Sequence, residues 1–235
     1  MELTFTLIDA EPTPLGLLTL HRYRAPDGAQ GYEVRIDDAF LMATHGAQGE
    51  ARMARLAWER LPEPRAELSV LVGGLGAGHT LRAALDLPGV AAVAVVELGA
   101  KVVDWNRRYF AATNGRALDD PRVRVWVADL AAVLRSPGAA WDLMLLDVDN
   151  GPGWLATPGN AWLYGPEGLR VTAAALKPGG VLAIWSPGPN AAFLETLRAA
   201  FPVVEEVRTT TEGERGEDVV YLVSFPAIPL TDFPL

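Results

Sequence analysis

The chain has 235 residues, half of them hydrophobic, which suffices for one substantial α/β domain with a small appendage and not for two full domains. Its 29 acidic residues outnumber 20 basic ones, and the formal charge of −9 argues against nucleic acid or an anionic membrane as the main partner. With no cysteine and three scattered histidines, we expect no metal site. We find neither a signal-peptide pattern nor an apolar run of membrane-spanning length, so we expect a cytoplasmic protein.

The first 48 residues predict a small antiparallel β-sheet that forms a region of its own. Turn signals at 12–14 and 27–28 separate its β-prone runs. These runs cover residues 3–8, 15–23, 32–36 and 40–43. A helix is expected from about 50 to 60, so a second region of residues 49–235 begins there.

Residues 68–235 show a different rhythm, in which apolar strands alternate with amphipathic helices. The apolar runs begin at residues 68, 90, 123, 141 and 179. Alternation of this kind is typical of βαβ units on a parallel sheet. The segment between the last two β-prone runs, 203–211 and 218–225, is short enough for a hairpin loop. We therefore predict an α/β fold with a mostly parallel sheet that ends in an antiparallel pair.

A glycine cluster supplies the first chemical pattern. Gly74, Gly76 and Gly78 follow an apolar strand and directly precede a helix. Glycines at such a corner let the backbone approach a ligand, and the helix start presents free N–H groups to it. His79 stands where a dinucleotide fingerprint needs a small residue, which argues against a standard NAD site. The alternative is a tight turn that binds nothing.

Two acids end the next two predicted strands. Glu97 lies 19 residues after Gly78, where a carboxylate can accept hydrogen bonds from the ribose hydroxyls of a nucleoside. Asp129 ends the following strand and can reach the base of that nucleoside. The alternatives are a surface acid at Glu97 and a helix N-cap at Asp129, and the N-cap role does not exclude binding.

Acidic and aromatic residues follow the fourth apolar strand. Asp147, Asp149 and Asn150 come at its end, and Trp154 and Tyr164 lie in the segment after it. Carboxylates pair with ammonium groups, aromatic faces attract cations, and a carboxylate can take the proton of an attacking nitrogen. The pattern predicts an amine site. The alternative is an Asx-type turn beside core tryptophans.

These segments together resemble the spermidine synthase family of aminopropyltransferases, within the Rossmann-like class I S-adenosylmethionine-dependent methyltransferase fold. The resemblance covers roughly residues 48–208 and includes the sequences VLVGGLGAGHTLRAAL, AVVELGAKVVDWN, LDDPRVRVWVADLAAVL, WDLMLLDVDNGP and LKPGGVLAIWS. It implies a seven-stranded, mostly parallel sheet with an antiparallel C-terminal hairpin, and a small N-terminal sheet. It also implies that Glu97 binds the ribose, that Asp129 binds the adenine end and that Asp147 orients or deprotonates the amine.

The chain departs from the family pattern on the acceptor side. Ala77 stands where the family has an acid near the aminopropyl group, and the second acid of the catalytic loop falls near Asn150, with Asp149 one position early. On the helix expected after the N-terminal sheet, Glu50 is the one plausible acid. The exposed edges of the N-terminal sheet could pair in a homodimer, as they do in the family.

We therefore hypothesise a transferase that uses S-adenosylmethionine or its decarboxylated form, without a metal, to alkylate a small-molecule amine, with polyamine-type aminopropyl transfer favoured. Asp147 and Asp149 are the expected catalytic residues. The expected donor-binding residues are Gly74, Gly76, Gly78, Glu97 and Asp129, and the expected acceptor-binding residues are Glu50, Asn150, Trp154 and Tyr164. A small-molecule methyltransferase and a non-catalytic nucleoside-binding relative are the alternatives.

Overall fold

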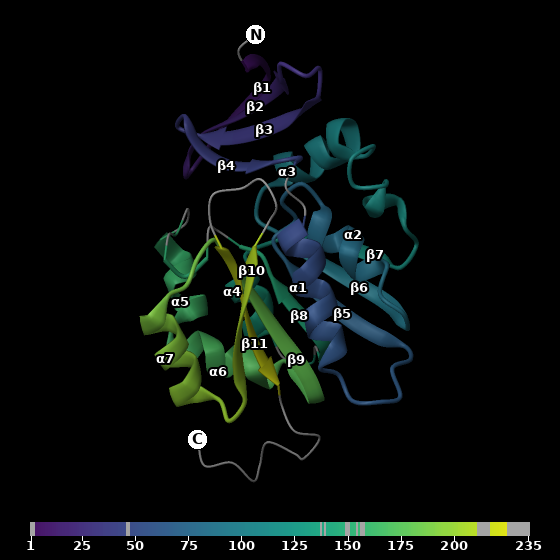
Figure 1. Cartoon of the computed structure of the whole chain (residues 1–235), viewed down its shortest axis with the longest axis vertical. Coiled ribbons are helices and arrows are strands. Elements are labelled where there is room, and N and C mark those ends of the chain that lie inside the picture. Colours follow the sequence, from purple (N-terminus) through teal and green to yellow (C-terminus); the bar gives the residue numbers. More distant parts are fainter. Residues whose placement is uncertain are drawn as a thin grey trace.

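A computed structural model describes residues 3–45, 48–136, 138, 140–148, 151–153, 155, 158–210 and 217–224, with the side chains of residues 209 and 210 excepted. The chain forms two sheets (Figure 1). The first is a four-stranded antiparallel sheet in the order β1-β2-β3-β4. Its strands are β1 (Thr4–Thr13), β2 (Gly16–Arg24), β3 (Gln30–Ile36) and β4 (Ala39–Ala43).

The second sheet has seven strands in the order β10-β11-β9-β8-β5-β6-β7. The four pairings among β9, β8, β5, β6 and β7 are parallel, and β11 runs antiparallel to both of its neighbours. Its strands are β5 (Leu68–Gly73), β6 (Val90–Glu97), β7 (Val123–Val127), β8 (Trp141–Leu146), β9 (Leu176–Ser186), β10 (Val204–Thr210) and β11 (Glu217–Ser224). The predicted α/β architecture is confirmed.

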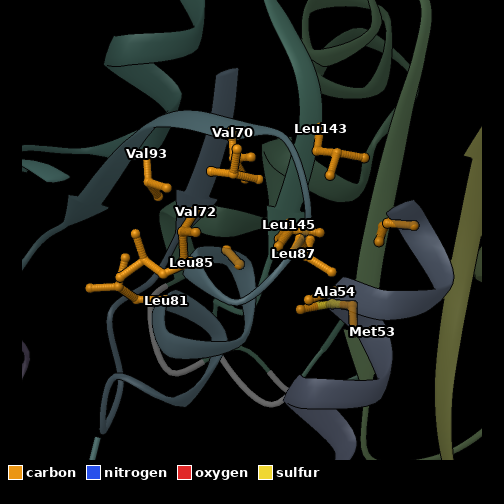
Figure 2. Packing of buried hydrophobic residues seen from close by; sticks show 14 of the residues in the cluster. Met53, Ala54, Val70, Val72, Leu81, Leu85, Leu87, Val93, Leu143 and Leu145 are labelled. Carbon is orange, nitrogen blue, oxygen red and sulfur yellow. The ribbon is translucent and has the colours of Figure 1, made fainter. Parts of the chain in front are cut away.

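Helices cover both faces of the large sheet. The α-helices are α1 (Gln48–Glu59), α2 (His79–Leu85), α3 (Ala100–Trp105), α4 (Leu130–Arg135), α5 (Ala161–Tyr164), α6 (Pro166–Ala174) and α7 (Ala191–Ala200). One buried cluster joins α1, α2 and α3 to the first face, and a second joins α4 to α7 to the other. Figure 2 shows part of the first cluster, where Met53 of α1 and Leu81 of α2 pack near Val72 and Leu145 of the central strands.

Strand periodicity explains this layering. Leu143 and Leu145 on β8 belong to the first cluster, and Met144 and Leu146 belong to the second. Successive side chains of a strand point to opposite faces, so a strand that is covered on both sides is apolar throughout. This is why the apolar runs of the sequence located the central strands.

Some element boundaries differ from the predictions. The first strand continues to Thr13, through most of the turn predicted at 12–14. The helix that follows β6 ends as an α-helix at Trp105 and continues as a π-helix over Asn106–Phe110. Hydrogen bonding by the Asn106 side chain, described below, accompanies this change. No helix among the described residues is long and apolar enough to cross a membrane.

The N-terminal sheet lies against the carboxyl end of the large sheet, above α3 (Figure 1). A third buried cluster joins its strands to the glycine turn, α3 and the π-helix, and consists of Leu18, Leu20, Val34, Ala77, Val102, Trp105 and Phe110. A polar contact supports this packing. Asp9 of β1 accepts a hydrogen bond from Trp105 Nε1 at 3.0 Å and pairs with Lys101 Nζ at 2.9 Å.

We expect Asp9→Asn to lower the melting temperature slightly at neutral pH. The hydrogen bond from Trp105 and the ammonium of Lys101 hold the pKa of Asp9 at about 2, below its ordinary value. A carboxyl with a depressed pKa stabilises the fold above its unfolded pKa, and that stabilisation is lost as the pH falls towards 2. Thermal denaturation should therefore show a difference between wild type and variant that shrinks at acid pH. Glu11→Gln, on the same strand, is the control, and an equal loss in it would contradict the assignment.

Candidate active site

The glycine turn follows β5 and is shaped by close packing. Gly74, Gly76 and Gly78 all have positive φ angles, of 88°, 51° and 88°. A Cβ on Gly74 would collide with the backbone carbonyl oxygen of Asp147, and one on Gly78 would lie 2.6 Å from Asn114 Nδ2. Gly74 therefore lets the end of β5 lie directly against the segment that follows β8. This contact places Gly74, a predicted donor-binding residue, against Asp147, a predicted catalytic residue.

Two buried asparagines, which sequence reasoning missed, hold the turn from behind. Asn106 in the π-helix donates from Nδ2 to the carbonyl oxygen of Gly76 at 2.8 Å. Asn114 donates from Nδ2 to the carbonyl oxygen of Ala77 at 3.1 Å and to Asn106 Oδ1 at 2.9 Å. π-helical turns occur often at functional sites, and here the turn directs a side chain into the glycine loop. The sequence signal that could have identified them is the presence of two asparagines in a segment that otherwise has an amphipathic pattern.

Glu97 ends β6 and is tied to the glycine turn by backbone N–H groups. Leu75 N donates to Glu97 Oε2 at 2.9 Å, and Gly99 N donates to Oε1 at 2.7 Å. Burial raises the pKa of this carboxyl above its usual value, and the backbone hydrogen bonds partly oppose the shift. A carboxylate has about four acceptor positions, so each oxygen retains capacity for a further donor such as a hydroxyl.

Asp129 is the N-cap of α4, the alternative that the sequence left open. Its Oδ1 accepts a hydrogen bond from Ala131 N at 2.8 Å, so one carboxylate oxygen is engaged in capping. The residue follows β7, on the same edge of the sheet as Glu97 and Asp147. Its predicted contact with an adenine base stays a prediction.

Asp147 directly follows β8 and is half-buried beside the glycine turn. Its N–H donates to the carbonyl oxygen of Gly73 at 2.8 Å, and its Oδ2 accepts a hydrogen bond from Thr80 Oγ1 at 2.7 Å. Burial raises the pKa of the carboxyl, the Thr80 hydrogen bond opposes the shift, and the negative charge of Asp218 adds to it. A carboxylate with raised proton affinity at a strand end is suited to accept a proton.

Of the predicted acceptor residues, Asp149, Asn150 and Trp154 lie outside the described residues. Tyr164 is buried and donates its hydroxyl to the carbonyl oxygen of Val148 at 2.9 Å, so it supports the backbone next to Asp147. Glu50 lies in the first turn of α1. Its neighbour Gly49 comes close to Asp218 on β11 and Trp185 on β9, which places the start of α1 at the same sheet edge.

His79, which argued against a standard NAD site, is the first residue of α2. Its Nε2 is buried and has no hydrogen-bond partner among the described residues. Burial lowers the pKa of the imidazole, and the nearby His45 adds to this effect.

The sheet order and the glycine turn define a Rossmann-like fold of the class I methyltransferase type. A spermidine synthase structure determined with the transition-state analogue AdoDATO has a TM-score of 0.76 and 21% identity, and the match covers 97% of this chain and 76% of that one. Human methyltransferase-like protein 13, in complex with SAH, has a TM-score of 0.53 and 20% identity, with 80% and 82% of the two chains covered. At these identities the likeness concerns the fold.

Residues 52–197 match the family model described as the spermine/spermidine synthase domain. The chain belongs to this family. The polyamine aminopropyltransferase of Mycobacterium tuberculosis (strain ATCC 25618 / H37Rv) is 31% identical over 177 residues, which cover 69% of this chain and 33% of that protein. Polyamine aminopropyltransferase 2 of Pseudomonas aeruginosa is 31% identical over 159 residues, 63% of this chain and 43% of that protein. The chain thus spans about a third of the mycobacterial relative.

Proposed function

We propose that the protein is an aminopropyltransferase that alkylates a small amine with decarboxylated S-adenosylmethionine. Family membership and the names of the curated relatives support this class of reaction. The observation that carries the proposal is the placement of Asp147. Its half-buried carboxyl, with a raised pKa, lies at the end of β8 in contact with the glycine turn.

The donor is proposed to lie along the carboxyl ends of β5, β6 and β7. Ligands of open α/β sheets bind at this edge, and the glycine turn lets the backbone come close to them. Glu97 would hold the ribose hydroxyls with the acceptor positions that its two backbone hydrogen bonds leave open. Asp129 would face the adenine, and Gly74, Gly76 and Gly78 would border the sugar and sulfur.

The amine would approach from the side of Asp147. Its nitrogen attacks the carbon next to the sulfonium, the carbon–sulfur bond breaks, and sulfur leaves as the neutral thioether of methylthioadenosine. Asp147 takes the proton that the nitrogen loses. The protein thus contributes position and a base. Asp149 would assist in catalysis, and Glu50, Asn150, Trp154 and Tyr164 would border the acceptor.

The test is incubation with decarboxylated S-adenosylmethionine and a panel of mono-, di- and triamines. Release of methylthioadenosine together with an aminopropylated amine would support the proposal. Transfer of a methyl group from S-adenosylmethionine, with no methylthioadenosine from the decarboxylated donor, would overturn it in favour of a methyltransferase. Binding of methylthioadenosine without turnover of either donor would favour a non-catalytic relative.

We also propose that the protein acts in the cytoplasm as a homodimer formed through the N-terminal sheet. Strand β1 is an edge strand, and the alternate residues Leu3, just before it, and Phe5 and Leu7, within it, are all exposed. Apolar residues on an unpaired edge favour association with a second copy. Leu7→Lys should shift the chain from dimer to monomer in sedimentation velocity. Val203→Lys changes an exposed apolar residue just before β10, in the large sheet, and should leave the dimer intact. A wild-type monomer would contradict the proposal.

A further inference from the structure

Asp218, at the start of β11, lies at the same edge of the large sheet as Asp147. Strand β11 is antiparallel to β9, and Val219 pairs with Ser186, the last residue of β9. The beginning of β11 therefore coincides with the carboxyl ends of the parallel strands. Sequence reasoning assigned Asp218 no role, because the order of the strands within the sheet could not be read from the chain.

Asp147, Trp185 and Asp218 share one face of the sheet, the face covered by α1 and α2. The first buried cluster contains alternate residues of all three strands: Leu143 and Leu145 on β8, Val181 and Ala183 on β9, and Val220 and Leu222 on β11. Trp185 continues this alternation on β9 and packs against the same cluster. By the same two-residue period, Asp147 and Asp218 extend it on β8 and β11.

Strand β9 lies between β8 and β11, so Trp185 lies between Asp147 and Asp218 on this face of the sheet. Strands two apart are separated by roughly 10 Å, which is the spacing across the middle strand that carries Trp185. A Cβ built on Gly49 of α1 would lie 2.7 Å from Asp218 Oδ2 and 3.0 Å from Trp185 Nε1. Gly49 thus lets α1 start close to both groups. Trp185 Nε1 is buried and has no hydrogen-bond partner among the described residues, which is unusual for a buried donor.

The charges at this place favour a cation. Burial raises the pKa of the Asp147 carboxyl, and the negative charge of Asp218 adds to this shift. Among the described residues, Glu50 follows Gly49 on α1, while Arg208 on β10 and Glu217 on β11 flank Asp218 on the opposite face of the sheet. Arg208 donates to Glu206 at 3.0 Å and to Glu217 at 3.4 Å, so its guanidinium is engaged with those two acids.

We propose that Asp218 is a second carboxylate of the acceptor site, which holds a cationic amine against Asp147 over the face of Trp185. The inference rests on the proposed function and adds a residue to it. An alkylamine arrives as an ammonium, which carries more than one N–H donor and is attracted by an aromatic face. Asp218 supplies the charge that binds it, and Asp147 takes one of its protons, which frees the electron pair of the nitrogen for attack on the carbon next to the sulfonium. Asp218 is in this sense a positioning residue for the reaction.

The test compares Asp218→Asn with Glu217→Gln, which removes the same charge from the next residue of β11. With methylthioadenosine bound, the affinity for 1,4-diaminobutane, measured by calorimetry, should fall about tenfold in Asp218→Asn and stay near wild type in Glu217→Gln. The affinity for methylthioadenosine itself should not change. In turnover, the KM for the amine should rise more than kcat falls. Equal losses in both variants, or wild-type amine binding in Asp218→Asn, would overturn the inference.

A second readout is independent of turnover. Because a neighbouring negative charge raises the pKa of a carboxyl, carbon-13 NMR titration should show a lower pKa for Asp147 in Asp218→Asn. Gly49→Ala, which displaces the end of a flexible side chain, should fold and weaken amine binding as well. Amine binding that depends on Asp218 but no methylthioadenosine release would support this site and refute aminopropyl transfer. Full aminopropyl transfer by Asp218→Asn at the wild-type KM would refute this site and support aminopropyl transfer.

Discussion

Asp147→Asn is expected to reduce turnover by about 100- to 10,000-fold, the usual contribution of a positioned general base, while the affinity for methylthioadenosine stays within a few-fold of wild type. The asparagine keeps an oxygen that can accept the Thr80 hydrogen bond and keeps the backbone contact with Gly73. It cannot take a proton from an attacking nitrogen. Single-turnover release of methylthioadenosine, with donor binding measured separately, distinguishes loss of chemistry from loss of binding.

The same variant should be at least as stable as wild type at neutral pH. The pKa of the Asp147 carboxyl is raised above its ordinary value of 3.8, mainly by burial. The folded state therefore binds this proton more tightly than the unfolded state. As the pH rises from the unfolded pKa to the higher folded one, the wild type loses stability that the asparagine variant keeps. In thermal denaturation from pH 4 to pH 8, the melting temperature of the variant should rise relative to that of the wild type.

Asp142→Asn is the matched control, because Asp142 lies near the start of β8, the strand that Asp147 directly follows. Burial would raise the pKa of Asp142, but hydrogen bonds from Lys177 and Ser69 outweigh it and lower the pKa. Its removal should cost roughly 1–3 kcal/mol of stability and leave turnover at saturating substrate unchanged. Loss of turnover in Asp142→Asn equal to that in Asp147→Asn would show that the assay reports stability rather than catalysis.

The parts of the fold that could be predicted are those that one physical signal specifies. Strands covered on both faces must be apolar throughout, so the runs beginning at residues 68, 90 and 141 located β5, β6 and β8 within a residue or two. The carboxyl ends of parallel strands share one edge, so Glu97 and Asp147 could be placed near the glycine turn before any contact was known. Glu97 accepts a hydrogen bond from Leu75 in that turn, and Asp147 accepts one from Thr80 beside it, in agreement with this reasoning.

The residues that sequence reasoning missed depend on neighbours distant in the chain. Asn106 could not be distinguished from a surface polar residue until the glycine turn was seen to pack on it. Asp218 sits at the start of an antiparallel strand, and its importance follows from the position of β11 beside β9. The sequence pointed to the aromatic ring of Tyr164, but it could not show that the hydroxyl donates a hydrogen bond to the carbonyl oxygen of Val148, next to Asp147.

Gly74→Ala is expected to lower both stability and donor affinity more than any other single change in the glycine turn. The alanine would have to adopt a φ of 88°, and its Cβ would collide with the backbone oxygen of Asp147, which cannot move without shifting the end of β8. Left-handed strain and overpacking together cost roughly 2–5 kcal/mol. For a chain of this size the melting temperature should fall by roughly 5–15 °C.

Gly28→Ala separates the two causes of this loss. Gly28 has a φ of 92°, close to that of Gly74, but a Cβ there meets nothing within 4 Å. It should therefore show the backbone strain alone, and the excess loss in Gly74→Ala measures the collision with Asp147. Because that collision displaces the segment carrying the proposed base, Gly74→Ala should also reduce turnover at temperatures where it remains folded. If the two variants lost equal stability and Gly74→Ala kept full turnover, the close contact between β5 and the end of β8 would not be what joins the donor and acceptor halves of the site.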